Sequence, residues 1–306
     1  MKYLPIILFL LVVLSRGAAA QKADTWVQVS SQTRDFILSM PQQPKQQDLR
    51  ELKTNYGDQD VKGEVYESAA DGATYRVWGF TNPDKAARQQ GDADTYLDAY
   101  AEMVWEGLLK PQRDALPDDR KRFASMTYVK ELSAKAIPGR EYTFTIDNLT
   151  GTAQLFVTKS RAYVLVAMGP VGGSWTREPF FSSFSVDPAV PLLPTASGAI
   201  PGPNDLTDTL QVFKSSQVTE RARVLDKPEP SYTESARIFS ITGTVVLRAI
   251  FSSDGHVTNL VIIRRLPHGL TEKAIKAAQA IRFTPAVKDG KSVSMWMQLE
   301  YNFNLY

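Results

Sequence analysis

The stretch VSMWMQLEYNFNL, residues 293–305, has the most regular pattern in this chain and indicates the fold of its C-terminal part. Every second position of it is apolar: Val293, Met295, Met297, Leu299, Tyr301, Phe303 and Leu305. The positions between them are polar except for Trp296. Such strict alternation is typical of a strand with one buried face and one solvated face. The strand is longer than its expected neighbours, so part of its edge can remain unpaired.

The segment before this strand predicts a hairpin. One strand begins at Gly243, a second begins at Val257, and the turn Ser253-Asp254-Gly255 lies between them. The side chains expected on the inner face of the first strand are Val245, Leu247, Ala249 and Phe251. Those expected on the inner face of the return strand are Val257, Asn259, Val261 and Ile263.

Two helices are predicted around this hairpin. Thr233 is the expected cap of a short helix that runs through Phe239, and Thr271 is the expected cap of a longer one. The longer helix carries one apolar stripe, made of Ala274, Ile275, Ala278 and Ile281. Together with the long strand these elements predict an α+β domain of order αββαβ.

Short motifs in this region resemble the C-terminal domain of TonB-type energy transducers. They are Pro228 to Tyr232, Ala236-Arg237, Gly243 to Leu247, Asp254 to Val257, Gly269-Leu270, Arg282 to Ala286 and Asp289 to Lys291. The whole series occurs in the family's order over about 80 residues. The chain departs from the family at Thr233, where the family usually has proline after the tyrosine.

The resemblance implies that the domain recognises a short extended segment of an outer-membrane receptor, or of another envelope protein, by strand addition. An exposed strand edge supplies main-chain hydrogen bonds, and alternate side chains supply selectivity. The predicted partner-strand residues are Tyr232, Trp296, Gln298, Glu300 and Asn302. An alternative interpretation is that Trp296 covers the helix or contacts a second copy of the chain, which would form a homodimer through this strand.

The N-terminal part, residues 25–187, predicts a second α+β domain. Short strands are expected at 26–29, 36–40 and 74–80, with a polar loop at 42–48 and a helix capped by Asp94. After Pro138-Gly139, period-two alternation predicts three consecutive strands in an antiparallel meander. A final helix near residues 178–184 is expected to lay Phe180, Phe181 and Phe184 on the sheet.

This order of elements resembles the PsbP-like α/β fold, an antiparallel sheet layered with helices. The motifs that carry the resemblance are short, and they are residues 36–41, 138–142 and 180–184. The same residues also fit an ordinary α+β domain whose phenylalanines form the core.

The remaining segments predict export and a linker. Residues 1–20 combine Lys2, an apolar run with Pro5 and the small residues Ala18 to Ala20, which is typical of a secretory signal cleaved after Ala20. We therefore expect the protein in the periplasm, or anchored in the inner membrane if the signal is retained. Residues 188–222 are the expected linker and extended entry, because five prolines lie between Pro188 and Pro203. The C-terminal domain then covers residues 223–306.

Several classes of function are disfavoured by composition. The chain has no cysteine, so thiolate catalysis and thiolate metal sites are excluded. A formal net charge of +2 shows no electrostatic footprint for nucleic acid. His256 and His268 are the only histidines, and both are expected to be surface residues rather than metal ligands. We predict no catalytic residue, no metal and no cofactor.

Two functions remain at this point. The first is a periplasmic, non-enzymatic binding or adaptor protein, linked to TonB-dependent transport across the outer membrane. The second is a structural protein of the cell envelope, in which the C-terminal domain dimerises the chain and the N-terminal domain binds the partner. An energy-transducing role fits poorly, because the apolar run lacks a histidine and the linker is short.

Limited proteolysis tests the predicted linker. We expect the first cuts in the full chain to fall between Pro188 and Leu206, since prolines at this density prevent a shared strand ladder. The fragments should remain folded when their circular dichroism is measured. A single cooperative melt without cleavage in this segment would contradict the prediction.

Overall fold

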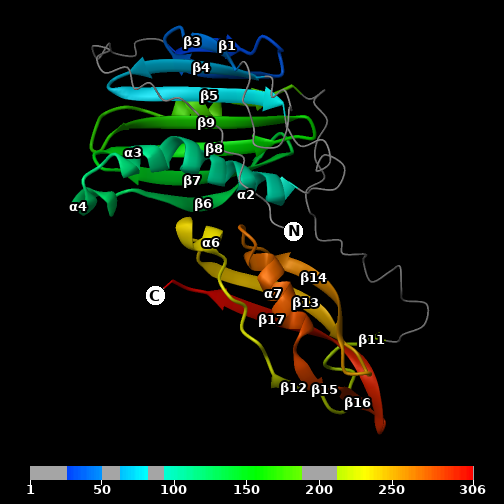
Figure 1. Cartoon of the computed structure of the whole chain (residues 1–306). Helices are drawn as coiled ribbons and strands as arrows, with labels where there is room; N and C mark the ends of the chain where they lie inside the picture. The colour runs from blue at the N-terminus through cyan, green and yellow to red at the C-terminus, as the bar shows by residue number, and fades with distance from the viewer. Residues whose placement is uncertain (1–25, 50–62, 82–92, 188–211, 306) are drawn as a thin grey trace, which may run out of the picture. The chain divides into compact units, whose positions relative to one another are not determined.

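The computed structural model describes residues 26–49, 63–81, 93–187 and 212–305 (Figure 1). The chain divides into two compact units, Met1–Thr195 and Ala196–Tyr306. The expected signal and residues 188–211 of the expected linker lie outside the described residues. Within the described ranges, no helix is both long enough and apolar enough to cross a membrane.

A seven-stranded antiparallel sheet forms the centre of the N-terminal unit, with strand order β3-β4-β5-β9-β8-β7-β6 (Figure 1). Its strands are β3 (Lys45–Leu49), β4 (Gly63–Ala70), β5 (Ala73–Thr81), β6 (Ser125–Ala134), β7 (Ile137–Ile146), β8 (Leu149–Val157) and β9 (Arg161–Pro170). The predicted meander is confirmed, because β8 pairs antiparallel with both β7 and β9.

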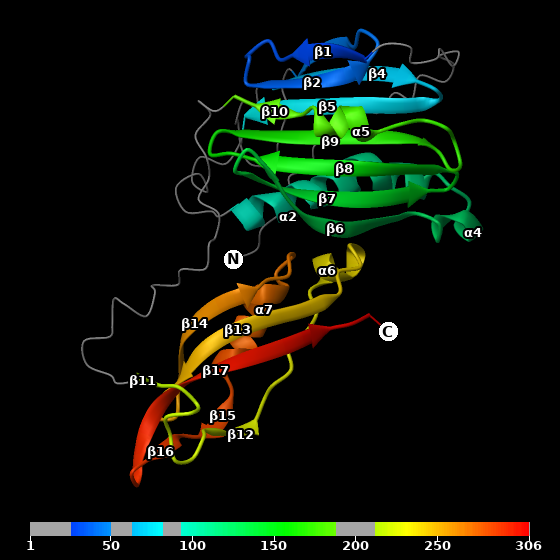
Figure 2. The same ribbon diagram turned by 180° about the vertical axis from the view of Figure 1, so that it is seen from behind.

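Both faces of this sheet are covered in part by other elements. On one face lie α5 (Glu178–Ser182) and a small sheet of β1 (Trp26–Ser30), β2 (Phe36–Pro41) and β10 (Ser185–Val186), as Figure 2 shows. On the opposite face α2 (Ala93–Val104) continues into the π-helical turn η1 (Trp105–Leu109) and α3 (Lys110–Asp114). A short helix, α4 (Asp118–Lys121), precedes β6. The predicted layering of helices on an antiparallel sheet is confirmed.

The core under the small sheet is aromatic. Phe36 lies edge-on to Tyr163, with ring centroids 5.8 Å apart, and Tyr75 contacts Phe180 in the same way. Phe180 and Phe184 are buried on the sheet as expected, whereas Phe181 is only half-buried. Edge-to-face rings of this kind stabilise a core beyond the area they bury.

Four strands of the N-terminal unit, β3, β4, β6 and β10, were not predicted from the sequence. The expected loop at 42–48 is wrong from residue 45 onward. Residues 45–49 form β3 at the edge of the sheet, and all of them except Leu49 are polar. In β6 a bulge at Val129 breaks the alternation that would indicate a strand. The hairpin turn is Lys135-Ala136, where both residues have positive φ, so Pro138-Gly139 lies inside β7 rather than before it.

Arg140 of β7 holds α2 on the sheet. Its side chain is fully buried, and its guanidinium donates to Asp94 (2.8 Å), to Asp98 and to Glu131 (2.9 Å). The sequence predicts Asp94 as the cap of this helix. In the structure α2 begins at Ala93, so Asp94 lies inside its first turn, where it pairs with Arg140. Burial raises the pKa of Glu131, and the charge of Arg140 offsets only part of that rise.

Replacing this arginine tests its role. Arg140→Met should lower the free energy of unfolding by about 3–5 kcal/mol, because removing one partner of a buried ion pair leaves uncompensated charges. Urea unfolding of the full chain measures the change. Lys121→Met is the control, since Lys121 pairs with Asp118 at the surface and its loss should leave stability nearly unchanged. Equal effects of the two substitutions would contradict the assignment.

The C-terminal unit contains three long antiparallel strands, β13 (Gly243–Phe251), β14 (Val257–Arg264) and β17 (Lys291–Phe303). The shorter strands are β11 (Val212–Phe213), β12 (Arg223–Asp226), β15 (Arg282–Thr284) and β16 (Ala286–Lys288). Two helices accompany them, α6 (Glu234–Ile238) and α7 (Leu270–Gln279). The predicted order αββαβ is confirmed for the main elements.

The helix caps differ in how well the sequence predicts them. Thr233 caps α6, because its hydroxyl accepts a hydrogen bond from the backbone N–H of Ala236 (3.1 Å). The same prediction for Thr271 is wrong. Helix α7 begins after Gly269, which has a left-handed φ of 76°, and the Thr271 hydroxyl bonds both backbone groups of Leu266 instead.

The predicted inner face of β14 is correct only at its start. Asn259 has a positive φ, and the register with β13 shifts between Arg248 and Ile250. This bulge reverses the alternation of the following residues. Leu260 is consequently buried while Ile263 is exposed, so the placement of Val261 and Ile263 on the inner face is wrong.

Candidate strand-pairing edge

The two edges of β17 are used very differently. Along one edge β13 pairs continuously, from Gly243 opposite Phe303 to Phe251 opposite Met295. Strand β16 pairs with residues 291–293, and β11 pairs in parallel with residues 294–295. Among the described residues, no strand pairs with the second edge of β17 from Trp296 to Phe303. The unpaired part expected from the length of the strand is therefore present, and we call it the open edge.

The faces of β17 follow the predicted alternation closely. Met295, Leu299, Tyr301 and Phe303 are buried, and Gln298, Glu300 and Asn302 are exposed. Two positions differ. Leu305 follows the end of the strand and is 39% exposed, and Ser294 is buried, with its hydroxyl accepting from the N–H of Ser253 (3.0 Å).

Outer-face side chains of β17 contact one another or β13. The ring of Trp296 lies 4.5 Å from the guanidinium of Arg248, which is a cation–π contact. Asn302 accepts a hydrogen bond from the hydroxyl of Thr244 (2.7 Å), and Gln298 donates to the carboxylate of Glu300 (2.9 Å). The structure thus brings four of the five predicted partner-strand residues onto one face.

Tyr232 is the predicted residue that does not join this face. Its ring contacts Phe303 edge-on at 5.5 Å, and its hydroxyl donates to the carbonyl of Ile241. Phe303 belongs to the buried face of β17, so Tyr232 lies on the inner side of the sheet. Burial raises the pKa of Tyr232 above its ordinary value.

Sequence reasoning did not select Lys227, which the structure places at the open edge. Its ammonium donates to the backbone carbonyl of Glu300 (2.6 Å) and lies 4.5 Å from the ring centroid of Tyr301. The contact joins residues 73 positions apart in the sequence. Only its place beside Pro228, in the extended entry, could have drawn attention to it.

The two histidines have different environments. His256 is exposed and lies 3.4 Å from Asp254 in the hairpin turn. His268 is buried, with Nδ1 2.6 Å from the hydroxyl of Ser235 and its ring stacked on Phe239. The expectation that both are surface residues is wrong for His268. In the described part of the chain, no group of three or more His, Asp or Glu side chains could hold a metal ion.

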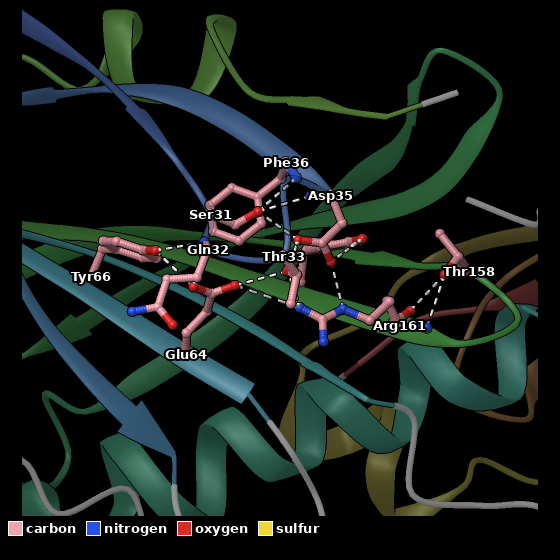
Figure 3. Close-up of polar contacts among 10 residues, drawn as sticks. Ser31, Gln32, Thr33, Asp35, Phe36, Glu64, Tyr66, Thr158 and Arg161 are labelled. Carbon is pink, nitrogen blue, oxygen red and sulfur yellow. Dashed lines mark hydrogen bonds and ion pairs between the residues drawn. The ribbon is translucent and has the colours of Figure 1, made fainter. Parts of the chain in front are cut away.

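A second polar site lies in the N-terminal unit, where the β1–β2 turn meets β4 and β9 (Figure 3). Asp35 is its centre: one carboxylate oxygen accepts from the hydroxyls of Ser31 and Thr33 (2.7 Å each). The other accepts from the guanidinium of Arg161 (2.5 Å) and the hydroxyl of Tyr163 (3.1 Å).

This cluster is built for stability rather than for acid–base chemistry. Burial would raise the pKa of Asp35, but the hydroxyl hydrogen bonds and Arg161 outweigh it and hold that pKa below its usual range. The nearby Glu64 is also bonded, because it accepts from the hydroxyl of Tyr66 (2.7 Å). Since these hydroxyls donate to carboxylates, no nucleophile or poised general base results.

The C-terminal unit is thus a small α+β domain with a helix-backed antiparallel sheet, in which the long strand β17 keeps an open edge. Residues 228–305 match the family model of the Gram-negative bacterial TonB protein C-terminal. The resemblance seen in the sequence is confirmed there. The family consists of non-enzymatic protein-interaction domains of the bacterial envelope.

The solved structures that are similar to the chain include the solution NMR structure of the Pseudomonas aeruginosa TonB CTD. The match has 24% sequence identity, covers 28% of this chain and 86% of that chain, and has a TM-score of 0.25. None of the curated proteins matches the chain.

The cluster around Asp35 makes stability depend on pH. Its lowered pKa means that ionised Asp35 stabilises the folded state above the ordinary aspartate pKa of about 4. This stabilisation is lost as the pH falls through the lower pKa of the folded protein. Asp35→Asn should therefore cost about 1–3 kcal/mol at pH 7 and much less near pH 2.5.

Urea unfolding of the full chain at both pH values measures this difference. Asp114→Asn is the control, because Asp114 is exposed and pairs with its neighbour Arg113. A cost of Asp35→Asn that is the same at both pH values would show that the carboxylate charge is not what stabilises the turn.

Proposed function

We propose that this protein is a non-enzymatic binding or adaptor protein of the periplasm that takes up an extended partner segment along the open edge of β17. The observation that carries the proposal is the unpaired edge from Trp296 to Phe303. An edge of this kind offers a row of N–H and C=O groups to a partner strand. The match of residues 228–305 to the TonB C-terminal family model supports it.

The edge strand β6 of the N-terminal unit has features that discourage strand pairing, and the open part of β17 differs from it in these features. Strand β6 ends the seven-stranded sheet, and it carries two features that discourage pairing, the bulge at Val129 and the exposed Lys130. Strand β17 pairs with β13 over nine consecutive residues without a register shift. Its open part contains no lysine and no proline. Such a regular edge, without a register shift, is suited to strand addition.

The hydrogen bond of Lys227 to the Glu300 carbonyl indicates which N–H and C=O groups of β17 point toward the open edge. Because β13 occupies one edge of β17, the Glu300 carbonyl that accepts from Lys227 faces the open edge. In an antiparallel pair, alternate residues direct both their N–H and their C=O to the same neighbour. The backbone groups of Trp296, Gln298 and Asn302 therefore also face the open edge.

Outer-face side chains of β17 would then supply selectivity. A partner strand places every second side chain beside Trp296, Gln298, Glu300 and Asn302. Trp296 offers an aromatic surface, and the other three offer hydrogen-bonding groups at exposed positions. Tyr232 contributes indirectly, because it packs against Phe303 at the end of the strand.

In this proposal the partner is a segment of an outer-membrane receptor or of another envelope protein, and the role is linked to TonB-dependent transport. The mature protein is periplasmic after loss of residues 1–20. Residues 25–187 form a PsbP-like domain, which the antiparallel sheet with helical layers supports. The proposed linker is shorter than residues 188–222, because β11 (Val212–Phe213) already pairs with β17 of the C-terminal domain.

The same open edge favours a second candidate, a homodimer in which two copies of β17 pair with each other. A regular edge without a strand partner is a template for either kind of strand. The N-terminal domain would then bind the partner, and the protein would be a structural component of the envelope.

Proline at Gln298 tests strand addition. Gln298→Pro removes a backbone N–H that faces the open edge, so it should weaken peptide binding by about tenfold or more. Gln298→Ala keeps the N–H and should change affinity by no more than about threefold. Trp296→Ala removes one aromatic contact and should have an intermediate effect. Isothermal titration of nine-residue peptides, selected from a random library on the full chain, measures the affinities.

Circular dichroism must first show that the proline variant is folded. If a folded Gln298→Pro variant binds the selected peptides as tightly as the parent, the proposed strand addition is wrong. Sedimentation at several concentrations examines the second candidate. A parent dimer that Gln298→Pro dissociates, with no edge-dependent peptide binding, would establish dimerisation as the role of this edge.

A further inference from the structure

Lys227 carries a charge that no carboxylate neutralises among the described residues. Its hydrogen-bond acceptor is the Glu300 carbonyl, and its other close contact is the ring of Tyr301. Of the acidic residues near it, Asp226 pairs with Arg282, and the carboxylate of Glu300 accepts from Gln298. Glu229 lies two residues along the chain, and in the described part of the chain no ion pair joins it to Lys227. Because the Lys227 ammonium contacts a carbonyl and an aromatic ring, which are uncharged, it can still form an ion pair with an acidic side chain of a partner.

The backbone around Lys227 favours this position. Pro228 follows directly, and a residue before proline is biased toward extended conformations. Lys227 is exposed, while its ammonium lies over the buried ring of Tyr301. The charge is therefore placed on the inner side of the sheet, at the margin of the open edge, and it remains accessible from solvent.

The pairing geometry predicts which partner residue meets this charge. When a strand pairs with the open edge, the residue opposite Tyr301 directs its side chain to the same face as Tyr301. This holds for a parallel and for an antiparallel partner. The partner backbone would take over the Glu300 carbonyl, which frees the donors of Lys227 beside that side chain.

We propose that Lys227 selects partner segments with aspartate or glutamate opposite Tyr301. The inference rests on the proposed strand addition and adds the chemistry of the partner to it. The lysine has two states, since it caps an edge carbonyl in the free protein and forms an ion pair in the complex. A segment with lysine or arginine at that position is disfavoured by like charge.

Selection from a random nine-residue phage library tests the inference. The full chain is immobilised as the parent, as Lys227→Glu and as Lys291→Glu, and the selected pools are sequenced. Lys291→Glu is the matched control, because it changes the net charge equally but lies at the exposed start of β17 beside β16. The parent and Lys291→Glu pools should be enriched in one acidic position, and the Lys227→Glu pool in a basic one.

Affinities of individual peptides make the test quantitative. Replacing the selected acid by its amide should weaken binding to the parent about three- to fivefold, the effect of a partly exposed ion pair. The difference should shrink at high salt and vanish in Lys227→Met, which keeps the aliphatic stem on Tyr301. Lys227→Met also serves if Lys227→Glu does not fold.

The outcomes separate the two proposals. Pools whose binding is abolished by Gln298→Pro but which show no acidic position overturn the role of Lys227 and leave strand addition intact. An acidic bias that persists in Lys227→Glu also overturns it. Pools that are insensitive to Gln298→Pro, or no enrichment at all, overturn strand addition and the inference with it.

Discussion

The pairing of β17 with β13 is the constraint on which the C-terminal unit depends. Nine consecutive residue pairs, from Gly243–Phe303 to Phe251–Met295, fix which face of each strand is buried. Because side chains alternate, a shift of one residue would expose Leu299 and Tyr301 and bury Gln298 and Glu300. The same pairing leaves only one edge of β17 available. The inner core and the open edge are therefore two consequences of one register.

The two units use buried polar groups and strand edges in different ways. In the N-terminal unit, Arg140 and Asp35 are enclosed by opposite charges and hydroxyls, and the edge strand β6 carries a bulge. These buried ion pairs and hydrogen bonds stabilise the position of α2 and of the β1–β2 turn. In the C-terminal unit, the charge of Lys227 stays at the surface and contacts the open edge of β17 through the Glu300 carbonyl. Charges that are already paired hold the fold, and those without a carboxylate partner can serve binding.

Much of the fold could be predicted because local periodicity reports directly on burial. The long strand, the meander and α7 each carry an unbroken pattern of period two or 3.6. Errors occurred where the pattern is interrupted or absent: β3 is polar, β6 is bulged at Val129, and Asn259 reverses the faces of β14. A bulge is one extra residue, and its position depends on the partner strand, which the local sequence does not contain.

The alternation of β17, the resemblance of residues 228–305 to the TonB C-terminal domain and four side chains of the candidate edge could be predicted from the sequence, since these depend on neighbours along the chain. Three features follow from the packing of distant segments instead: which edge of β17 stays open, the position of Tyr232 on the inner side, and the contact of Lys227 with the Glu300 carbonyl. The same holds for the buried contact of His268 with Ser235. Each of these joins residues far apart in the chain, and their meeting is set by packing and not by local periodicity.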